Sequence, residues 1–146
     1  KEALELCNEA VDNGITMSKE KEIKFARARA LAETQAYPEA KKAFEEIMGT
    51  KEWRGEATAG SLFWLGLMEE RQGRHAEAVG FYRRCYQTWK KYEVWSAKAY
   101  LGTARILADK LGQKPEAKLV LAEMLSKDRI KDTPEAAEAK SLNTRL

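Results

Sequence analysis

The sequence predicts an all-helical protein, a solenoid of antiparallel helix pairs, on three observations. The 146 residues are 44% hydrophobic and 34% charged, with only 9 Gly and 3 Pro. This composition is too apolar for disorder and too poor in turn residues for a many-stranded β-sandwich or barrel. The dipeptide Glu-Ala recurs every 37 to 39 residues, and such a period is typical of a solenoid. In three copies, apolar residues follow the alanine at offsets of four, seven and eight, which is one face of an α-helix.

The Glu-Ala period places one helix after each copy of the dipeptide. The copies that follow this period are Glu2-Ala3, Glu39-Ala40, Glu77-Ala78 and Glu116-Ala117. After Ala40, for example, the helical face carries Phe44, Ile47 and Met48. We expect the first copy, at 1–14, to be the second helix of an incomplete repeat.

The later copies are each preceded by another amphipathic stretch, which we predict to be the first helix of a pair. These stretches lie at 18–34, 56–72 and 94–111. The repeats then run at about 18–50, 56–92 and 94–127, with a closing helix at 133–146. Glycines that end helices and prolines in first turns support these boundaries: Gly49, Gly73, Gly112, Pro38, Pro115 and Pro134. We expect a single domain over 1–146, and a piece of a longer protein because the chain begins with Lys1.

The second full pair carries the residues of a known repeat family. Its small and large packing positions, between 59 and 92, are Leu62, Leu65, Gly66, Gly73, Ala78, Tyr82 and Cys85. This pattern resembles the tetratricopeptide repeat, and the pairs on either side match more loosely. The resemblance implies a right-handed superhelix in which Gly66 and Gly102 let helices approach while Tyr82 fills the space. In the third pair, Gly102 and Gly112 are ten residues apart where Gly66 and Gly73 are seven, so we expect a first helix about three residues longer.

In this family, one stripe of each first helix lines a concave groove that binds partners. Carried over residue by residue, the stripe is Glu22, Phe25, Arg29, Glu33, Gly60, Phe63, Leu67, Glu70, Arg71, Ser96, Ala99, Thr103 and Ile106. From it we predict the partner-binding residues Phe25, Arg29, Phe63, Leu67, Arg71 and Thr103. The resemblance implies a noncatalytic protein–protein interaction or scaffold module that holds a peptide or partner subunit in the groove. The bordering arginines suit an acidic flank, although the stripe lacks the lysine and asparagine set of the family's chaperone-tail binders.

A second hypothesis is a helical-repeat module that binds nucleic acid. Four aromatic residues, with neighbouring basic side chains, could stack bases at one edge: Tyr86, Trp89, Tyr92, Trp95, Lys90, Lys91, Arg83 and Arg84. The net charge of +3 is too small and too mixed to favour nucleic acid as the partner. Salt-dependent binding to an oligonucleotide would separate the two hypotheses.

The sequence contains no motif for catalysis, metal binding or a cofactor, and we expect none of these. Two Cys and one His are too few for a Cys/His zinc site. His75 lacks a neighbouring nucleophile or orienting acid, and we expect it at the surface. Cys7 and Cys85 lie on apolar helix faces, which favours buried thiols over reactive ones.

Other features of the sequence predict the cellular location of the protein and its association with other copies. The longest stretch without a polar side chain, 62–68, has seven residues, whereas a membrane-spanning helix needs roughly twenty. The proline-headed final helix resembles those of bacterial envelope repeat proteins of the Tol–Pal coordinator and outer-membrane assembly kind. That resemblance implies a periplasmic or outer-membrane-associated protein, the alternative being a cytoplasmic one. The helix around Leu4, Cys7 and Val11 lacks a preceding partner, so we expect self-association through it.

Overall fold

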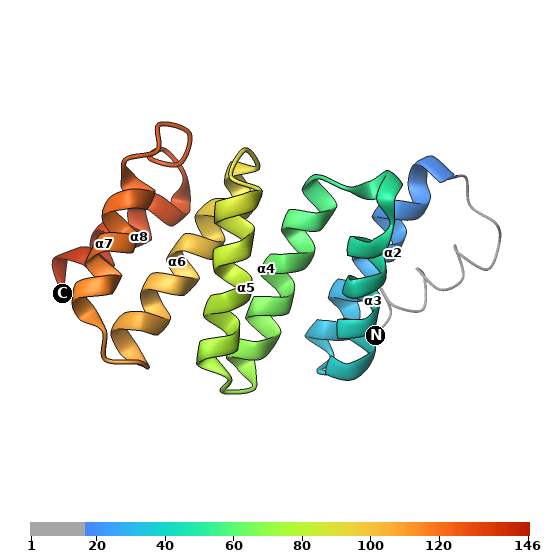
Figure 1. Ribbon diagram of the computed structural model, residues 1–146, viewed down its shortest axis with the longest axis horizontal. Coiled ribbons are helices and arrows are strands. Elements are labelled where there is room, and N and C mark those ends of the chain that lie inside the picture. The colour runs from blue at the N-terminus through green and yellow to red at the C-terminus, as the bar shows by residue number, and fades with distance from the viewer. Residues whose placement is uncertain (1–16) are drawn as a thin grey trace.

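The computed structural model describes residues 17–146 and is all-helical over that range (Figure 1). It has seven α-helices and one 3₁₀ turn, and no strand in the described part of the chain. They are α2 (Met17–Glu33), α3 (Tyr37–Gly49), η1 (Lys51–Trp53), α4 (Glu56–Arg71), α5 (His75–Thr88), α6 (Glu93–Asp109), α7 (Lys114–Leu125) and α8 (Pro134–Thr144). The predicted all-α class is confirmed. The predicted opening helix at 1–14 and the self-association through it lie outside the described residues.

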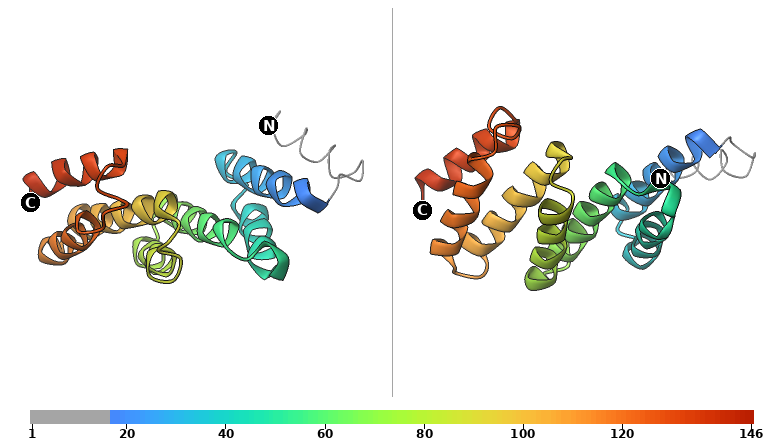
Figure 2. Two further views of the ribbon diagram at one scale, coloured as in Figure 1. Left: turned by 90° about the horizontal axis from the view of Figure 1, so that it is seen from above. Right: turned by 45° about the horizontal axis from the view of Figure 1, so that its top comes forward.

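The helices form two layers in a curved slab. Figure 2 shows α2, α4, α6 and α8 along the concave side, with α3, α5 and α7 behind them. Each inner helix packs on the next inner helix and on the outer helices adjacent to it in sequence. The first helix of each predicted pair therefore lies in the inner layer. The handedness of a longer superhelix stays a prediction.

The helix boundaries follow from local chemistry. Pro38, Pro115 and Pro134 lie in the first turns of α3, α7 and α8, where the missing N–H leaves no helical hydrogen bond unmade. The Thr133 hydroxyl caps α8 by accepting a hydrogen bond from the Ala136 N–H at 3.2 Å. The turn after α4 passes through Gly73 at φ +80°, a conformation that glycine adopts without a steric cost.

The alanines of the Glu-Ala period occupy equivalent packed positions. Ala40, Ala78 and Ala117 are all fully buried, on α3, α5 and α7. Each lies where an outer helix meets the inner layer, so a larger side chain would push the two layers apart. The prediction made for these three residues is confirmed.

Three helices pack closely around the Tyr82 ring of α5. A Cβ atom placed on Gly66 of α4 would lie 2.6 Å from this ring, and one on Gly102 of α6 would lie 2.7 Å from its other edge. The Tyr82 hydroxyl donates a hydrogen bond to Glu70 Oε1 at 2.7 Å. Glu70 also accepts from Arg105 Nη2 at 3.0 Å. Tyr82 therefore ties α4, α5 and α6 together.

The tyrosine remains a hydrogen-bond donor over the whole physiological pH range. Burial, together with the negative charge of Glu70, raises the pKa of the Tyr82 phenol well above its ordinary value. The neutral hydroxyl is the form that can donate to a carboxylate.

We expect Gly66→Ala or Gly102→Ala to lower the free energy of unfolding by about 1–3 kcal/mol, because the added methyl group overpacks the Tyr82 ring. Gly80→Ala is the matched control. A Cβ atom on Gly80 meets nothing within 4 Å. Gly80→Ala should therefore raise the free energy of unfolding by about 0.5–1 kcal/mol, because alanine favours the helix more than glycine does. Urea denaturation measures all three, and equal effects at the three glycines would contradict the packing account.

Candidate binding groove on the inner helices

Five aromatic rings form a closed circuit between the inner helices α2, α4 and α6 and the outer helix α3. The rings come from four helices: Phe25 on α2, Phe44 on α3, Phe63 and Trp64 on α4, and Trp95 on α6. Successive ring centroids around the circuit lie 5.8 to 6.3 Å apart. Most of these contacts are edge-to-face or tilted, the arrangements that aromatic pairs favour. We call these five residues the aromatic circuit.

Gly60 of α4 lets the circuit close. A Cβ atom on Gly60 would lie 2.8 Å from the Phe25 ring and 3.0 Å from the Trp95 ring. Rings from α2 and α6, two inner helices on opposite sides of α4, therefore meet over this glycine. Any side chain at Gly60 would separate them.

A cavity of about 310 Å³ opens beside the circuit, between α2, α4 and α6. The half-buried rings of Phe25 and Trp95 and the small side chains of Ala26 and Ala57 give it an apolar interior. Charged side chains complete the lining: Lys21, Glu22, Arg29 and Glu56. The cavity can take an apolar side chain from outside, with polar groups around it.

Two arginines lie over the Trp64 ring of the circuit. The Arg29 guanidinium is 5.4 Å from the ring centroid and that of Arg71 is 5.9 Å away. Both arginine side chains are otherwise exposed. Cation–π contact of this kind holds a guanidinium in place without neutralising its charge.

The structure brings five of the six predicted partner-binding residues to the same region. Phe25 and Arg29 line the cavity, and Arg71 reaches Trp64 from the end of α4. Phe63 is half-buried within the circuit and stacks on Tyr82, with the ring centroids 5.6 Å apart. Leu67 is half-buried as well and packs against the α2–α4 core.

The structure corrects the prediction for Thr103. Its side chain is fully buried, and the hydroxyl donates to the Ala99 carbonyl at 2.9 Å. The rest of the stripe predicted on this helix, Ser96, Ala99 and Ile106, is buried too. None of the four is available to a partner.

The correction has a geometric cause in the register of α6. This helix ends seven residues after Gly102, whereas α4 ends five residues after Gly66. Measured from the helix end, the position equivalent to Gly66 is therefore Ala104. A shift of two residues rotates the stripe by about 200° around the helix axis, which turns Thr103 away from the concave face.

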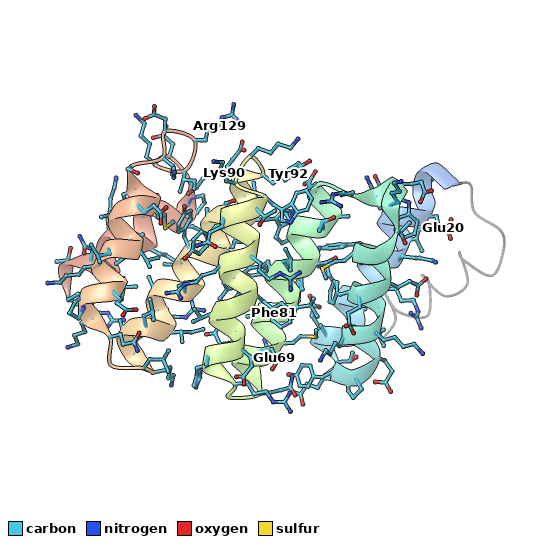
Figure 3. All side chains as sticks on the ribbon, in the orientation of Figure 1. Glu20, Glu69, Phe81, Lys90, Tyr92 and Arg129 are labelled. Atoms are coloured by element: carbon cyan, nitrogen blue, oxygen red, sulfur yellow. The ribbon has the colours of Figure 1, made fainter. Side chains whose placement is uncertain are left out.

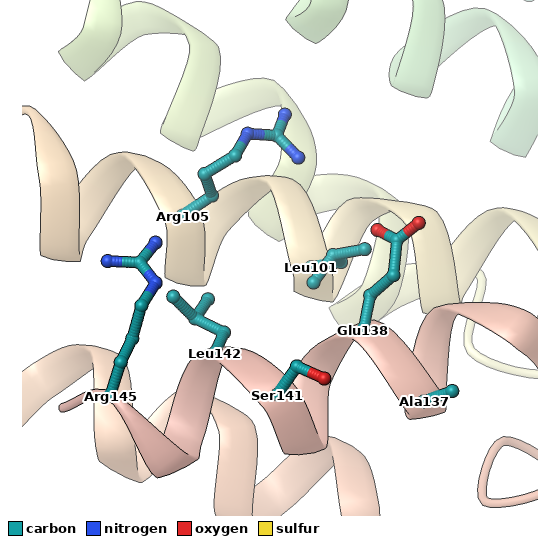
Figure 4. Close-up of a pocket in the computed structure, with 7 residues that line it drawn as sticks. All are labelled: Leu101, Arg105, Ala137, Glu138, Ser141, Leu142 and Arg145. Carbon is teal, nitrogen blue, oxygen red and sulfur yellow. The ribbon is translucent and has the colours of Figure 1, made fainter.

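Leu101 and Arg105 take the place of the predicted α6 stripe. They line a second cavity, of about 460 Å³, against Ala137, Glu138, Ser141, Leu142 and Arg145 of the α8 segment (Figure 4). Arg105 is paired with Glu70, and Arg145 is paired with Asp109 at 3.0 Å. The hydrogen bonds from Arg145 lower the pKa of Asp109. Both arginines are thus already occupied by carboxylates.

The aromatic residues of the nucleic-acid hypothesis do not form one stacking surface. Tyr86 is buried and stacks on Tyr100, with the ring centroids 3.9 Å apart. The Arg54 guanidinium lies over Trp89, and Trp95 belongs to the aromatic circuit. Tyr92 stays at the edge that it shares with Lys90 in Figure 3. Of the four aromatic residues, only Trp89 and Tyr92 remain together at this edge, with their ring centroids 6.4 Å apart, and two of the four belong to the packed interior.

One comparison with known proteins adds to this geometry. Residues 61–91, which cover most of α4 and α5, match the family model described as a tetratricopeptide repeat. This segment is therefore similar to a tetratricopeptide repeat. No curated protein and no solved structure matches the chain. A tetratricopeptide repeat indicates a protein–protein interaction module, and the matched segment contains Phe63, Trp64, Leu67 and Arg71.

Within the described residues, neither the histidine nor any cluster of metal ligands belongs to the candidate binding groove. His75 is half-buried at the start of α5 rather than at the surface, and its Nδ1 has no hydrogen-bond partner within 17–146. Residues 17–146 bring no three His, Cys, Asp or Glu side chains together as a metal site. None of the helices described could span a membrane.

Cys85 is fully buried on α5, within the segment 61–91 that matches the tetratricopeptide repeat. Its thiol donates to the Ala59 carbonyl at 3.4 Å, and burial raises the pKa of the Cys85 thiol to about 12. Cys7 lies outside the described residues, and its burial stays a prediction.

We predict that the Cys85 thiol does not react in the folded protein. We also predict that Cys85 makes the folded protein less stable as the pH rises above 9. In a Cys7→Ser variant, a thiol reagent at pH 8 should modify Cys85 only at the rate of unfolding. The unfolded thiol ionises above about pH 9 and the folded one only near pH 12, so its contribution to stability falls as pH rises through this window. Cys85→Ala should lessen the loss of stability between pH 8 and pH 10, and an unchanged pH profile would contradict the burial argument.

Proposed function

We propose that this protein is a noncatalytic interaction module that holds a segment of a partner protein on its concave face. The observation that carries the proposal is the cavity between α2, α4 and α6, with half-buried aromatic rings from two non-adjacent helices in its lining. The tetratricopeptide match at 61–91 supports the same class of function. An apolar side chain of the partner segment would enter this cavity.

The dimensions of the cavity favour a side chain over a whole small molecule. At about 310 Å³ it lies at the lower end of the range for ligand pockets. A side chain that covers the Phe25 and Trp95 rings would remove apolar area from water, and each 100 Å² removed stabilises the complex by roughly 2.5 kcal/mol before the costs of association. The larger opening between α6 and α8 offers the same segment room to continue along the concave face.

Within this proposal, Phe63 supports the binding surface and is not itself its main contact. It touches Trp64, Tyr82 and Trp95 at once, so it positions the rings that line the cavity. The periplasmic location and the self-association expected from the sequence stay predictions, and the binding proposal does not depend on either.

We expect Phe63→Ala to lower the free energy of unfolding by about 3 kcal/mol, because it opens the aromatic circuit. The melting temperature should fall accordingly, while the folded fraction keeps part of its affinity for a bound peptide. If melting is unchanged and only binding is lost, Phe63 is a direct contact and this assignment of roles is wrong.

A peptide selection tests the proposed function. We would select a phage library of random 12-residue peptides on the immobilised full chain and compare two variants. Ala26→Trp places a large side chain in the mouth of the cavity, whereas Ala122→Trp places one at an exposed position on α7 of the outer layer. Peptides enriched on the wild type should bind the Ala122→Trp variant and fail to bind the Ala26→Trp variant. No enrichment, or equal binding to both variants, would overturn the proposal.

A further inference from the structure

Two cations beside the aromatic circuit, Arg29 and Arg71, have no acidic partner among residues 17–146. Neither Arg29 nor Arg71 makes an ion pair with any residue in 17–146, although the structure contains six other ion pairs in that range. Glu70, the neighbour of Arg71 in sequence, is taken by Tyr82 and Arg105. The charges of Arg29 and Arg71 are therefore available to a partner.

Trp64 holds these two cations together. Arg29 comes from α2 and Arg71 from α4, and both guanidiniums lie over the same indole ring. Trp64 itself is only 7% exposed, and Phe44 stacks on it with the two ring planes 11° apart. A ring fixed in this way fixes the cations that lie over it, so less conformational entropy is lost when they bind an anion.

Trp64 also carries a polar group without a partner. Its indole Nε1–H is buried and no acceptor lies within hydrogen-bonding distance among the described residues. A buried donor that makes no hydrogen bond is unfavourable. The three side chains thus combine two cations that form no ion pair within 17–146 with one donor that forms no hydrogen bond there.

We propose that Arg29, Trp64 and Arg71 form an acid-binding cluster that takes a carboxylate side chain of the bound protein segment. The inference rests on the proposed function, and it adds the chemistry of the partner. Arg29 also lines the cavity next to Phe25, so the acidic residue of the segment lies close in sequence to its apolar anchor. Guanidinium groups suit this role because they bind carboxylates through paired, charge-assisted hydrogen bonds.

The roles of the three residues differ. Arg29 and Arg71 are the groups that contact the carboxylate, whereas Trp64 is a positioning residue that sets where they lie. Loss of one charge-assisted contact should weaken binding by about tenfold or more. Loss of the indole should act through the arginines, and therefore only on segments that carry an acid.

The test uses the same random peptide library on three forms of the full chain. These are the wild type, Arg29→Gln with Arg71→Gln, and a control with Lys41→Gln and Lys42→Gln. The control removes the same charge from exposed positions on α3 in the outer layer. Peptides from the wild type and the control should be enriched in Asp and Glu beside an apolar residue, while those from the arginine variant should keep the apolar residue and lose the acids.

The outcomes separate this inference from the proposed function. If the arginine variant selects the same acidic peptides, or if wild-type peptides lack acids, the acid-binding cluster is overturned and the groove proposal stands. If no form enriches any peptide, the groove proposal fails and the inference fails with it. If a single-stranded 12-nucleotide DNA displaces the selected peptide from the wild type and from the control but not from the arginine variant, the cluster binds nucleic acid and the inference is wrong.

Calorimetry on one selected peptide tests the positioning role of Trp64. Replacing the acid of that peptide by its amide should weaken binding to the wild type about tenfold, and the loss should shrink at high salt. Trp64→Phe keeps an aromatic ring in the circuit but removes the indole. The Trp64→Phe variant should bind the acidic peptide more weakly than the wild type does and bind the amide peptide nearly as well. An equal loss of affinity for both peptides would show that Trp64 has only a structural role.

Discussion

The Tyr82 ring between two glycines is the contact on which the rest of this structure depends. Gly66 and Gly102 have no side chain to hold α4 and α6 apart, so the ring of α5 sets their separation. The Tyr82 hydroxyl then reaches Glu70, which in turn holds Arg105. One residue of the outer layer therefore determines the spacing of two inner helices and the charge balance on their concave side.

The same contact places the candidate site. Tyr82 stacks on Phe63, and Phe63 is one of the five rings of the aromatic circuit. The circuit is at once part of the hydrophobic core and the lining of the cavity between α2, α4 and α6. Stability and binding are consequently coupled at Phe63, whereas the exposed groups at the rim, such as Arg29, can change with little effect on folding.

The fold could be predicted from the sequence because its signal is local and periodic. The Glu-Ala copies located the buried alanines of three outer helices, and the resemblance to the tetratricopeptide repeat singled out Phe25 and Arg29, which line the cavity. Thr103 could not be placed in the same way, because a shift of two residues in α6 changes the face that a position occupies. Trp95 joins the cavity only through contacts with Phe25 and Phe63, far away in sequence, and no local pattern reports such contacts.

The most direct measurement of the central claim is the rate at which the Tyr82 ring flips. One edge of this ring lies against Gly66 and the other against Gly102, so a flip requires α4 and α6 to move apart. NMR spectra of tyrosine-labelled protein at low temperature should show separate signals for the two Cδ–H groups of Tyr82, and Gly80→Ala should leave them separate. A single averaged signal in the wild type would show that the ring is not held between the helices, and would contradict the account.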